Sequence, residues 1–360
     1  MTIQKVLDGK FTRRTILRAG AASAAWTAVA PAIIGSKAAA QENILYVNTW
    51  GGSWTDAQKV AYFAPFTAKT GIQIKTVEPV SLSKMKAQVQ SGTYDWDITS
   101  LGSIDFNQAV DEKLVEPIDY TIFNKNNVPA STLHRDAGVN SVVLGTCLVY
   151  RKDKFPNGGP QSWADFWDVK KFPGNRSMYN YPQAAIPFAL LADGVPKDKL
   201  FPLDLDRAFK KLDQIKPHIK VWWTQGNQSE QLIRDAEVDM IGMWNARAQI
   251  QMNQGVPLQI VWNESENDAG CWCVAKGTPR KKAAFQFLEY IIQPQGEAKF
   301  CELMFYGPSN PASLQYLPKE VLALSPSAPQ NEKVSFKLDA EWLAPKMPQV
   351  RERWTQWLAS

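Results

Sequence analysis

Residues 43–56 read Asn-Ile-Leu-Tyr-Val-Asn-Thr-Trp-Gly-Gly-Ser-Trp-Thr-Asp, and this stretch decides the fold class. It starts as a short β-rich run, continues through a glycine loop and becomes a helical pattern that lasts to about Lys69. Thr70-Gly71 ends that helix, and residues 72–77 alternate between apolar and polar side chains as a half-buried strand does. A strand, a helix and a second strand in this order predict the repeating unit of an α/β sheet.

The same alternation continues along the chain. A second helix is predicted over about Ser83–Gln90, a third strand over Trp96–Ser100, a helix near Ile104–Glu112 and a buried strand over Ser141–Tyr150. Strands that alternate with helices in this way predict a parallel α/β sheet.

The pattern changes at residue 152, where we predict a crossing into a second lobe. Residues 155–160 (Phe-Pro-Asn-Gly-Gly-Pro) are rich in turn formers, and Ser162 is placed to cap a new helix. The predicted elements beyond it are a helix over 206–215, the segments 221–223 and 238–244, a strand over 258–262, a return crossing over 270–275, a helix over 283–292 and a tryptophan-bearing tail over 342–358.

Composition and charge narrow the class of protein. The 360 residues are 45% hydrophobic, 21% charged and 11% aromatic, which is typical of a globular chain rather than a disordered or membrane-embedded one. The formal net charge is +5, but residues 1–40 hold six basic side chains and one acidic one, which leaves 34 of each in the rest. A neutral chain gives no electrostatic reason to expect binding to nucleic acid.

The N-terminus indicates export. Arg13-Arg14 precedes a weakly apolar run from Ala19 to Ile34, and Ala38-Ala39-Ala40 then offers a small-residue cleavage site. This pattern predicts a twin-arginine signal peptide over residues 1–40 and a periplasmic protein. The apolar run is shorter than the roughly 20 residues of a spanning helix, so a retained membrane anchor is the minor alternative.

An oxidising compartment makes the four cysteines relevant: Cys147, Cys271, Cys273 and Cys301. The chain has only two histidines, and neither is near a cysteine in sequence, so a metal site has too few ligands. We therefore expect buried thiols or one disulfide, with no metal and no cofactor.

Several further pieces of sequence occur in a recognisable order across nearly the whole mature chain. They are residues 66–74 (Phe-Thr-Ala-Lys-Thr-Gly-Ile-Gln-Ile), 94–100 (Tyr-Asp-Trp-Asp-Ile-Thr-Ser), 162–167 (Ser-Trp-Ala-Asp-Phe-Trp), 236–245 (Ala-Glu-Val-Asp-Met-Ile-Gly-Met-Trp-Asn), 283–288 (Ala-Ala-Phe-Gln-Phe-Leu) and 306–310 (Tyr-Gly-Pro-Ser-Asn). Together they resemble the solute-binding proteins of ABC importers, and most of all their spermidine/putrescine-binding group.

The resemblance implies an α/β fold of the type II periplasmic binding class. Each of two lobes is then a mixed, mainly parallel sheet flanked by helices, and the ligand cleft lies between the lobes. We expect lobe I to comprise residues 41–145 and 273–308, and lobe II residues 146–272 and 309–360.

The same resemblance implies the function. We expect a periplasmic component of an ABC importer that captures a small nitrogen-containing solute by lobe closure and delivers it to a membrane permease, acting as a monomer. An exported enzyme is the alternative from another class, but the sequence contains no nucleophile elbow, P-loop, His-Glu-x-x-His or dinucleotide turn. A chemoreceptor adaptor of the same fold is the third reading.

Two loops are candidate ligand sites because strand ends and helix N-termini meet in such a cleft. In the first loop, Trp50, Gly52, Ser53 and Trp54 combine glycines that let backbone N–H groups approach an anion with tryptophans that could wall the cleft. Ser100, Gly102 and Ser103 follow the third strand. The structural alternatives are a tight turn with core tryptophans and simple helix capping.

The second lobe supplies the other candidates. Trp244 and Asn245 lie in the stretch that resembles the family's second-lobe motif, where polyamine binders place an aromatic ring against the ligand, and Arg247 could hold a carboxylate. The weaker candidates are Tyr179, Tyr181, Trp223, Gln225 and Trp272. For Trp244 the alternative is core packing, and for Arg247 it is a solvated side chain.

The ligand class follows from what is missing. Polyamine binders fix ammonium ends with acidic side chains, and the matching places here, near Tyr181, Ala184 and Trp272, hold none. An unpaired buried ammonium costs several kcal/mol, so spermidine is disfavoured unless a nearby acidic run, Glu264, Glu266 and Asp268, substitutes. We expect a smaller amine, a quaternary ammonium compound, or an amino-acid-like zwitterion such as γ-aminobutyrate or an opine.

Overall fold

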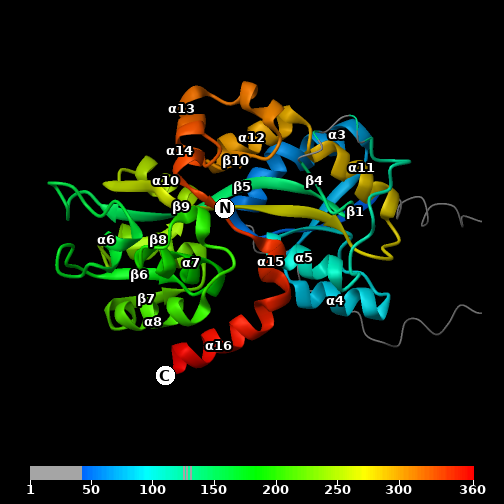
Figure 1. Cartoon of the computed structure of the whole chain (residues 1–360). Coiled ribbons are helices and arrows are strands. Elements are labelled where there is room, and N and C mark those ends of the chain that lie inside the picture. The colour runs from blue at the N-terminus through cyan, green and yellow to red at the C-terminus, as the bar shows by residue number, and fades with distance from the viewer. Residues whose placement is uncertain (1–42, 125, 127–128, 130–131) are drawn as a thin grey trace, which may run out of the picture. The chain divides into compact units, whose positions relative to one another are not determined.

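The computed structural model describes residues 43–124, 126, 129 and 132–360 (Figure 1). The predicted signal peptide lies outside these residues. Within them, no helix combines the length and the apolar character that a membrane span requires.

The first group of elements contains three parallel strands, each followed by helical structure. They are β1 (Ile44–Asn48), α2 (Gly52–Gln58), a π-helical turn (Lys59–Phe63), α3 (Ala64–Thr70), β2 (Gln73–Val77), α4 (Leu82–Ser91), β3 (Ile98–Leu101) and α5 (Ser103–Asp111). Gly71 ends α3 in the left-handed conformation, as the sequence predicts. β1 lies between β2 and β3 and is parallel to both. The predicted strand–helix alternation is confirmed.

The second group repeats this arrangement. It contains α6 (Trp163–Trp167), β6 (Arg176–Tyr179), α7 (Pro182–Ala192), α8 (Leu205–Ile215), β7 (Ile219–Trp223), α9 (Gly226–Arg234), β8 (Met240–Trp244) and α10 (Asn245–Asn253). The Ser162 hydroxyl accepts a hydrogen bond from the N–H of Asp165, which caps α6 as predicted. β6 lies between β7 and β8 and is parallel to both.

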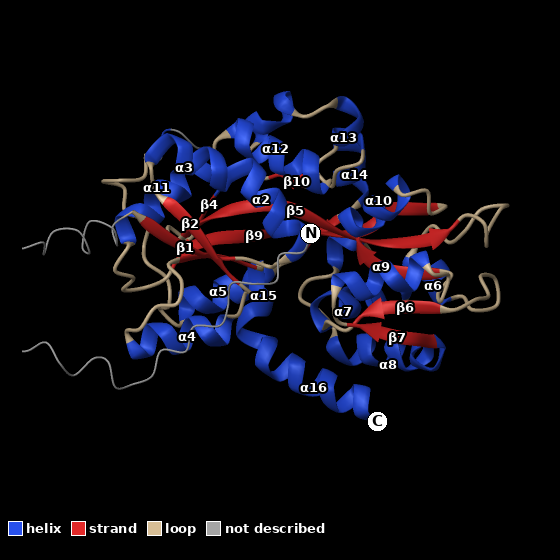
Figure 2. Cartoon of the chain, turned by 180° about the vertical axis from the view of Figure 1, so that it is seen from behind, coloured by secondary structure: helices blue, strands red, loops and turns tan. Residues whose placement is uncertain are grey.

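Two long antiparallel strands join the groups into one mixed sheet of order β2-β1-β3-β9-β5-β8-β6-β7. They are β5 (Gly138–Arg151) and β9 (Leu258–Val274), and Figure 2 shows both running from one group of strands to the other. β9 corrects the sequence prediction of a separate strand over 258–262 and a crossing over 270–275, because the intervening polar residues also pair with β5 or bulge out of the ladder.

The remaining elements cover the two groups. They are β4 (Leu133–His134), α11 (Lys281–Ile291), α12 (Pro294–Met304), β10 (Gly307–Pro308), α13 (Lys319–Ala323), α14 (Pro329–Val334), β11 (Phe336–Lys337), α15 (Ala340–Leu343), α16 (Met347–Ala359) and short 3-10 helices over 197–199, 216–218, 311–316 and 344–346.

α16 packs on the second group, beside α8 in Figure 1, where Trp354 and Trp357 contact Phe209. Leu314 and Leu317 pack instead into the core of the first group. The exact lobe boundaries stay a prediction.

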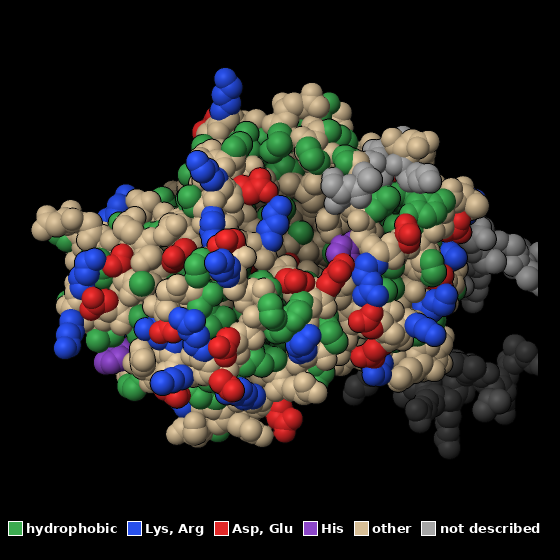
Figure 3. Space-filling model, in the orientation of Figure 1, with side chains coloured by type: hydrophobic (Ala, Val, Ile, Leu, Met, Phe, Trp, Pro, Cys, Tyr) green, Lys and Arg blue, Asp and Glu red, His purple; other side chains and the backbone are tan. Residues whose placement is uncertain are grey.

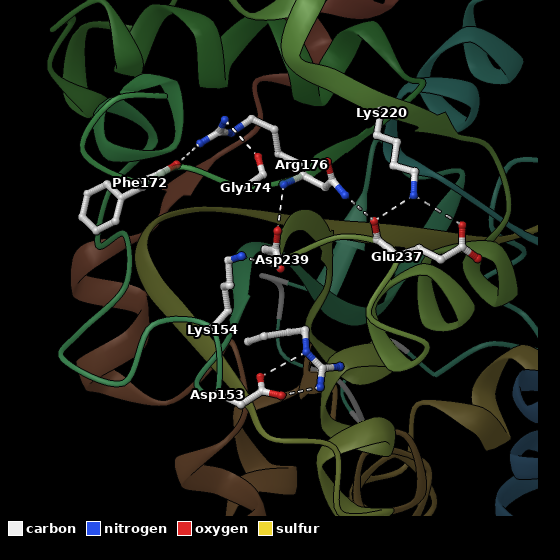
Figure 4. A network of polar contacts seen from close by, with 10 residues as sticks. Asp153, Lys154, Phe172, Gly174, Arg176, Lys220, Glu237 and Asp239 are labelled. Atoms are coloured by element: carbon white, nitrogen blue, oxygen red, sulfur yellow. Dashed lines mark hydrogen bonds and ion pairs between the residues drawn. The ribbon is translucent and has the colours of Figure 1, made fainter.

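A polar network fixes the amino ends of β6 and β8 (Figure 4). The buried guanidinium of Arg176 donates to the carbonyl oxygens of Phe172 and Gly174, and the carboxylate of Asp239 accepts the N–H of Asn175 at 2.8 Å. Polar groups are therefore used for structure at the amino ends of these strands. The carboxyl ends, on the opposite side, are left for a site.

Candidate functional site

The carboxyl ends of the parallel strands face one another across the middle of the sheet. Helices α2 and α5 start there on the first group, and α7, α9 and α10 start there on the second. Two contacts join the edges: Arg247 Nη1 lies 3.4 Å from Ser53 Oγ, and Arg351 Nη2 lies 3.1 Å from Asp105 Oδ1. Gly226, after β7, lies against Trp244 and Arg247, and Asp105 is close enough to Tyr181 to raise its pKa, after the larger effect of burial. The predicted loops after β1, β3, β7 and β8 thus lie in one region, which we call the cleft.

Aromatic rings form the wall of the cleft on the second group. The ring of Tyr179 stacks on Trp223 at 4.3 Å between centroids and on Tyr181 at 4.7 Å, and Trp244 meets Tyr179 edge-on at 5.2 Å. Trp223 is fully buried, and its indole N–H donates to the carbonyl of Gly242, so it supports the other rings from behind. We call Tyr179, Tyr181, Trp223 and Trp244 the aromatic cluster; its partly exposed rings offer faces to a cation or a methylene chain.

Arg247 lies beside Trp244 at one end of this cluster. Its guanidinium pairs with Glu230 at 2.7 Å, and Glu230 also accepts from Gln251. The Nε of Arg247 and the nearby indole Nε1 of Trp54 are both buried and have no acceptor among the described residues. Two such donors, close to the start of α2, suit a carboxylate.

Acidic groups lie at the other end of the aromatic cluster. Asp105, in the first turn of α5, and Glu266, on β9, both raise the pKa of Tyr179, after the larger effect of burial. Burial raises the pKa of Asp268, partly offset by hydrogen bonds from Ser103 and from the N–H of Ala269. The cleft therefore has buried N–H donors without an acceptor at one end of the aromatic cluster and carboxyl groups at the other.

The acidic run of β9 divides into two parts. The carboxylate of Glu264 accepts the N–H of Trp163 at 3.0 Å, while its carbonyl accepts the indole N–H of the same residue at 2.9 Å. Glu264 is therefore used to hold α6 and is not an ammonium anchor. Glu266 and Asp268 are the members of the run that lie near the aromatic cluster.

A hollow of about 320 Å³ opens beside Tyr181 at the acidic end. The residues that line it belong to the first group, to the start of α7 and to α16. They are Leu82, Ser83, Lys86, Asp105, Gln108, Glu112, Tyr181 and Arg351. Sequence reasoning missed Asp105 and Arg351, because their pairing joins positions 246 residues apart. The position of Asp105 in the first turn after a cleft-facing strand was the available signal.

Glu78, just after β2, is a third residue that sequence reasoning missed. Its carboxylate accepts the Thr55 hydroxyl at 2.8 Å and lies so close to Gly51 that a Cβ there would be 2.7 Å from Oε2. Gly51 also has a φ of +87°, so glycine is required at this turn. Glu78 braces the loop that carries Trp50, Gly52 and Ser53.

Three of the predicted site residues are buried and make contacts within the fold. Trp272 is buried and packs edge-on against Phe287 in the core of the first group. Asn245 is fully buried; its Oδ1 accepts the N–H of Gly145 and its Nδ2 donates to Phe305. Trp54 is 8% exposed and packs on Phe300.

The other candidates lie at the cleft-facing edges. Trp50 is 47% exposed, and Gly52, Ser53 and Gln225 are also exposed. Ser100 is buried at the end of β3, while Gly102 and Ser103 begin α5. Their role in ligand binding stays a prediction.

The cysteines and surface charges suggest no further chemistry at the site. Cys147, Cys271, Cys273 and Cys301 are buried free thiols, and no cluster of metal-ligating side chains occurs among the described residues. On the face drawn in Figure 3, basic and acidic side chains are interspersed rather than gathered into a patch of one sign.

Known proteins resemble this chain in sequence and in structure. Residues 61–330 match the model of a family described as bacterial extracellular solute-binding protein. The chain is 36% identical to a γ-aminobutyric acid-binding protein of Pseudomonas aeruginosa PAO1 over 89% of this chain and 93% of the relative.

Two solved structures share the fold and much of the sequence. An ABC transporter substrate-binding protein from Bradyrhizobium japonicum USDA 110 superposes with a TM-score of 0.84 at 35% identity, covering 88% of this chain and 99% of the other. The binding protein AgtB of A. tumefaciens R10, solved with agropinic acid, gives a TM-score of 0.80 at 31% identity with the same coverage. The predicted two-lobed type II periplasmic binding fold is confirmed.

Proposed function

The chain belongs to the family of bacterial extracellular solute-binding proteins, the ligand-capturing components of ABC importers, and we propose that its ligand is a zwitterion of the γ-aminobutyrate type. The relative that is 36% identical binds γ-aminobutyric acid by name, which supports this class.

The observation that carries the proposal is the polarity of the cleft. At one end Arg247 Nε and Trp54 Nε1 are buried donors without an acceptor among the described residues. At the other end the carboxylate of Glu266 is 4% exposed, and its Oε2 has no donor there. The aromatic cluster lies between them. A ligand with a carboxylate at one end, methylenes in the middle and an ammonium group at the other satisfies all three regions.

A polyamine satisfies two of these regions, the aromatic cluster and the acidic end, but not the third. Its second ammonium group would lie where Arg247 Nε and Trp54 Nε1 are hydrogen-bond donors, and these atoms cannot accept its N–H groups. A simple fatty acid would leave the acidic end unpaired. The two-ended charge pattern therefore favours a zwitterion, including an opine-like one, over spermidine.

Calorimetric titration of the mature protein tests this. γ-Aminobutyrate should bind, while spermidine and butyrate should bind at least about tenfold more weakly. In a thermal-shift screen, a ligand at 100 times its Kd adds about 2.7 kcal/mol of stability. If spermidine gives the largest shift, the zwitterion assignment is wrong. Mass spectrometry of the released ligand checks that it is returned unchanged, which separates a binding protein from an enzyme.

Location and partner complete the proposal. We propose that Arg13-Arg14 directs the chain through the twin-arginine route to the periplasm, where the closed, liganded form docks on a membrane permease. Relatives of the chain are periplasmic by name. Replacing both arginines by lysine should leave the uncut chain in the cytoplasm; normal processing of that variant would contradict the route.

A further inference from the structure

Glu266 and Asp268 are two residues apart on β9, and neither forms an ion pair within the part of the chain that the structure describes. Glu266 is 4% exposed, and its Oε2 has no hydrogen-bond partner among the described residues. Asp268 is partly buried, and burial raises its pKa. Hydrogen bonds from Ser103 and Ala269 offset part of that rise. Two adjacent carboxylates removed from water cannot both keep their charge cheaply, because each desolvated charge repels the other.

We propose that Glu266, buried near Asp268, holds a proton in the empty cleft and releases it when a protonated amine binds. The ligand's cation then replaces the proton. One carboxyl O–H bond breaks, the proton passes to the buffer, and an N–H of the ammonium group donates to the freed oxygen; no electron is transferred. The inference rests on the proposed function, because it assigns the amine end of the ligand to this pair.

The groups around the pair strengthen this behaviour. Burial and then the charge of Glu266 raise the pKa of Cys147 on β5 and of Tyr179 on β6, and Asp105 adds to the effect on Tyr179. Asp268 likewise raises the pKa of Cys271, after the larger effect of burial. None of these groups supplies a positive charge.

The nearest cations on packed elements are already paired. Lys337 follows Phe336, the β11 partner of Glu266, but is ion-paired with Glu332 at 3.1 Å. Arg247 pairs with Glu230 and Arg351 with Asp105. Burial and the charge of Asp268 accordingly raise the pKa of Glu266 well above its usual range.

This arrangement selects among amines. A primary or secondary ammonium group can donate an N–H to the carboxylate oxygen that lacks a partner, whereas a quaternary ammonium group cannot. The site is therefore specific for amines with N–H donors, although an aromatic cluster alone would accept a quaternary one.

Calorimetry of γ-aminobutyrate in buffers of different ionisation enthalpy counts the protons released. In the wild type we expect up to about one proton per ligand at low pH, with affinity rising up to about tenfold per pH unit until the pair is ionised. Glu266→Gln should release no proton and bind with an affinity that does not change with pH. Glu264→Gln is the matched control on the same strand, because its carboxylate serves Trp163, and it should behave as the wild type.

A second experiment uses only the wild-type protein, so the proposal can be tested even if Glu266→Gln does not fold. The N,N,N-trimethyl derivative of γ-aminobutyrate should bind at least about tenfold more weakly than the parent. Ligand binding without proton release at any pH, equal release by Glu266→Gln, or equal affinity for the trimethyl derivative would each overturn the inference.

Putrescine distinguishes this failure from failure of the proposed function. If putrescine binds with proton release and γ-aminobutyrate does not bind, the zwitterion assignment is wrong and the proton exchange is upheld. If γ-aminobutyrate binds without proton release, the function stands and the exchange is wrong. If neither amine binds, both are wrong.

Discussion

Arg351 and Asp105 form an ion pair of 3.1 Å between helices that belong to the two sides of the cleft. Arg351 is carried by α16, whose Trp354 donates its indole N–H to Asn180 just after β6. Asp105 is on α5, directly after β3. The pair is therefore a link across the cleft mouth that depends on the two groups being close together.

Arg351→Gln should weaken ligand binding about two- to fivefold, because a partly exposed ion pair contributes up to about 1 kcal/mol. The loss should appear as faster ligand dissociation, since the closed form is less stable. Stopped-flow displacement measures this rate. Arg353→Gln is the matched control, because Arg353 pairs with Asp206 of α8 on its own side. Equal dissociation rates in both variants would show that the link does not stabilise closure.

Trp244→Ala should weaken ligand binding at least about tenfold, because it removes a ring face that is partly exposed in the cleft and borders both Tyr179 and Trp223. Fluorescence or calorimetric titration measures the affinity. Trp272→Phe is the control: Trp272 is in the core of the first group, so its replacement should lower stability and leave affinity unchanged. Unchanged affinity in Trp244→Ala would remove that residue from the site.

Glu266 should make the unliganded protein less stable at high pH. Its pKa is raised in the folded state by burial and then by Asp268, so its stabilising contribution is full below the unfolded-state pKa and is lost as pH rises through the folded-state pKa. Urea unfolding over a pH series should show this decline in the wild type and a flatter profile in Glu266→Gln. An unchanged profile would mean that Glu266 is ionised in the empty cleft.

Glu116 should show the opposite dependence of stability on pH. Burial alone would raise its pKa, but the N–H of Gly277 and the ammonium groups of Lys276 and Lys281 lower it overall. Its contribution is therefore present above the unfolded-state pKa and is lost as pH falls. Glu116→Gln should reduce stability near neutral pH and flatten the acid limb of the same pH series, whereas Glu266→Gln changes the other limb.

Gly51→Ala should destabilise the protein more than Gly71→Ala. Gly71 is in the left-handed αL region, which costs a non-glycine residue roughly 1–2 kcal/mol, whereas Gly51 has φ +87° and ψ +171°, a region that is essentially restricted to glycine. A Cβ at Gly71 meets nothing within 4 Å, but at Gly51 it also displaces Glu78 from Thr55, which costs about 1 kcal/mol more. Urea unfolding measures the stability of both variants. Adding Glu78→Ala should reduce the difference; a difference that does not change would show that backbone strain alone causes it.

The sequence by itself determined the class of fold and much of its order. The run from β1 to α5 could be read because strand alternation, helix stops such as Gly71 and caps such as Ser162 act over only a few residues. The cleft loops could be found for the same reason: a site at strand ends is predictable once the strands are. The loop of Ser103 was predicted in this way, whereas Trp244 and the nearby Arg247 were predicted because residues 236–245 resemble a motif of the family.

Only the tertiary structure decided which of those residues lie at the cleft. Trp272 and Trp244 are alike in sequence, yet one is in the core and the other at the cleft. Glu264 and Glu266 are neighbours in one acidic run, but the bulge of β9 turns the first to Trp163, 101 residues away, and leaves the second buried without a partner. Such roles depend on contacts between distant segments, and their energies are set by burial and by the charges brought nearby, which no local pattern records.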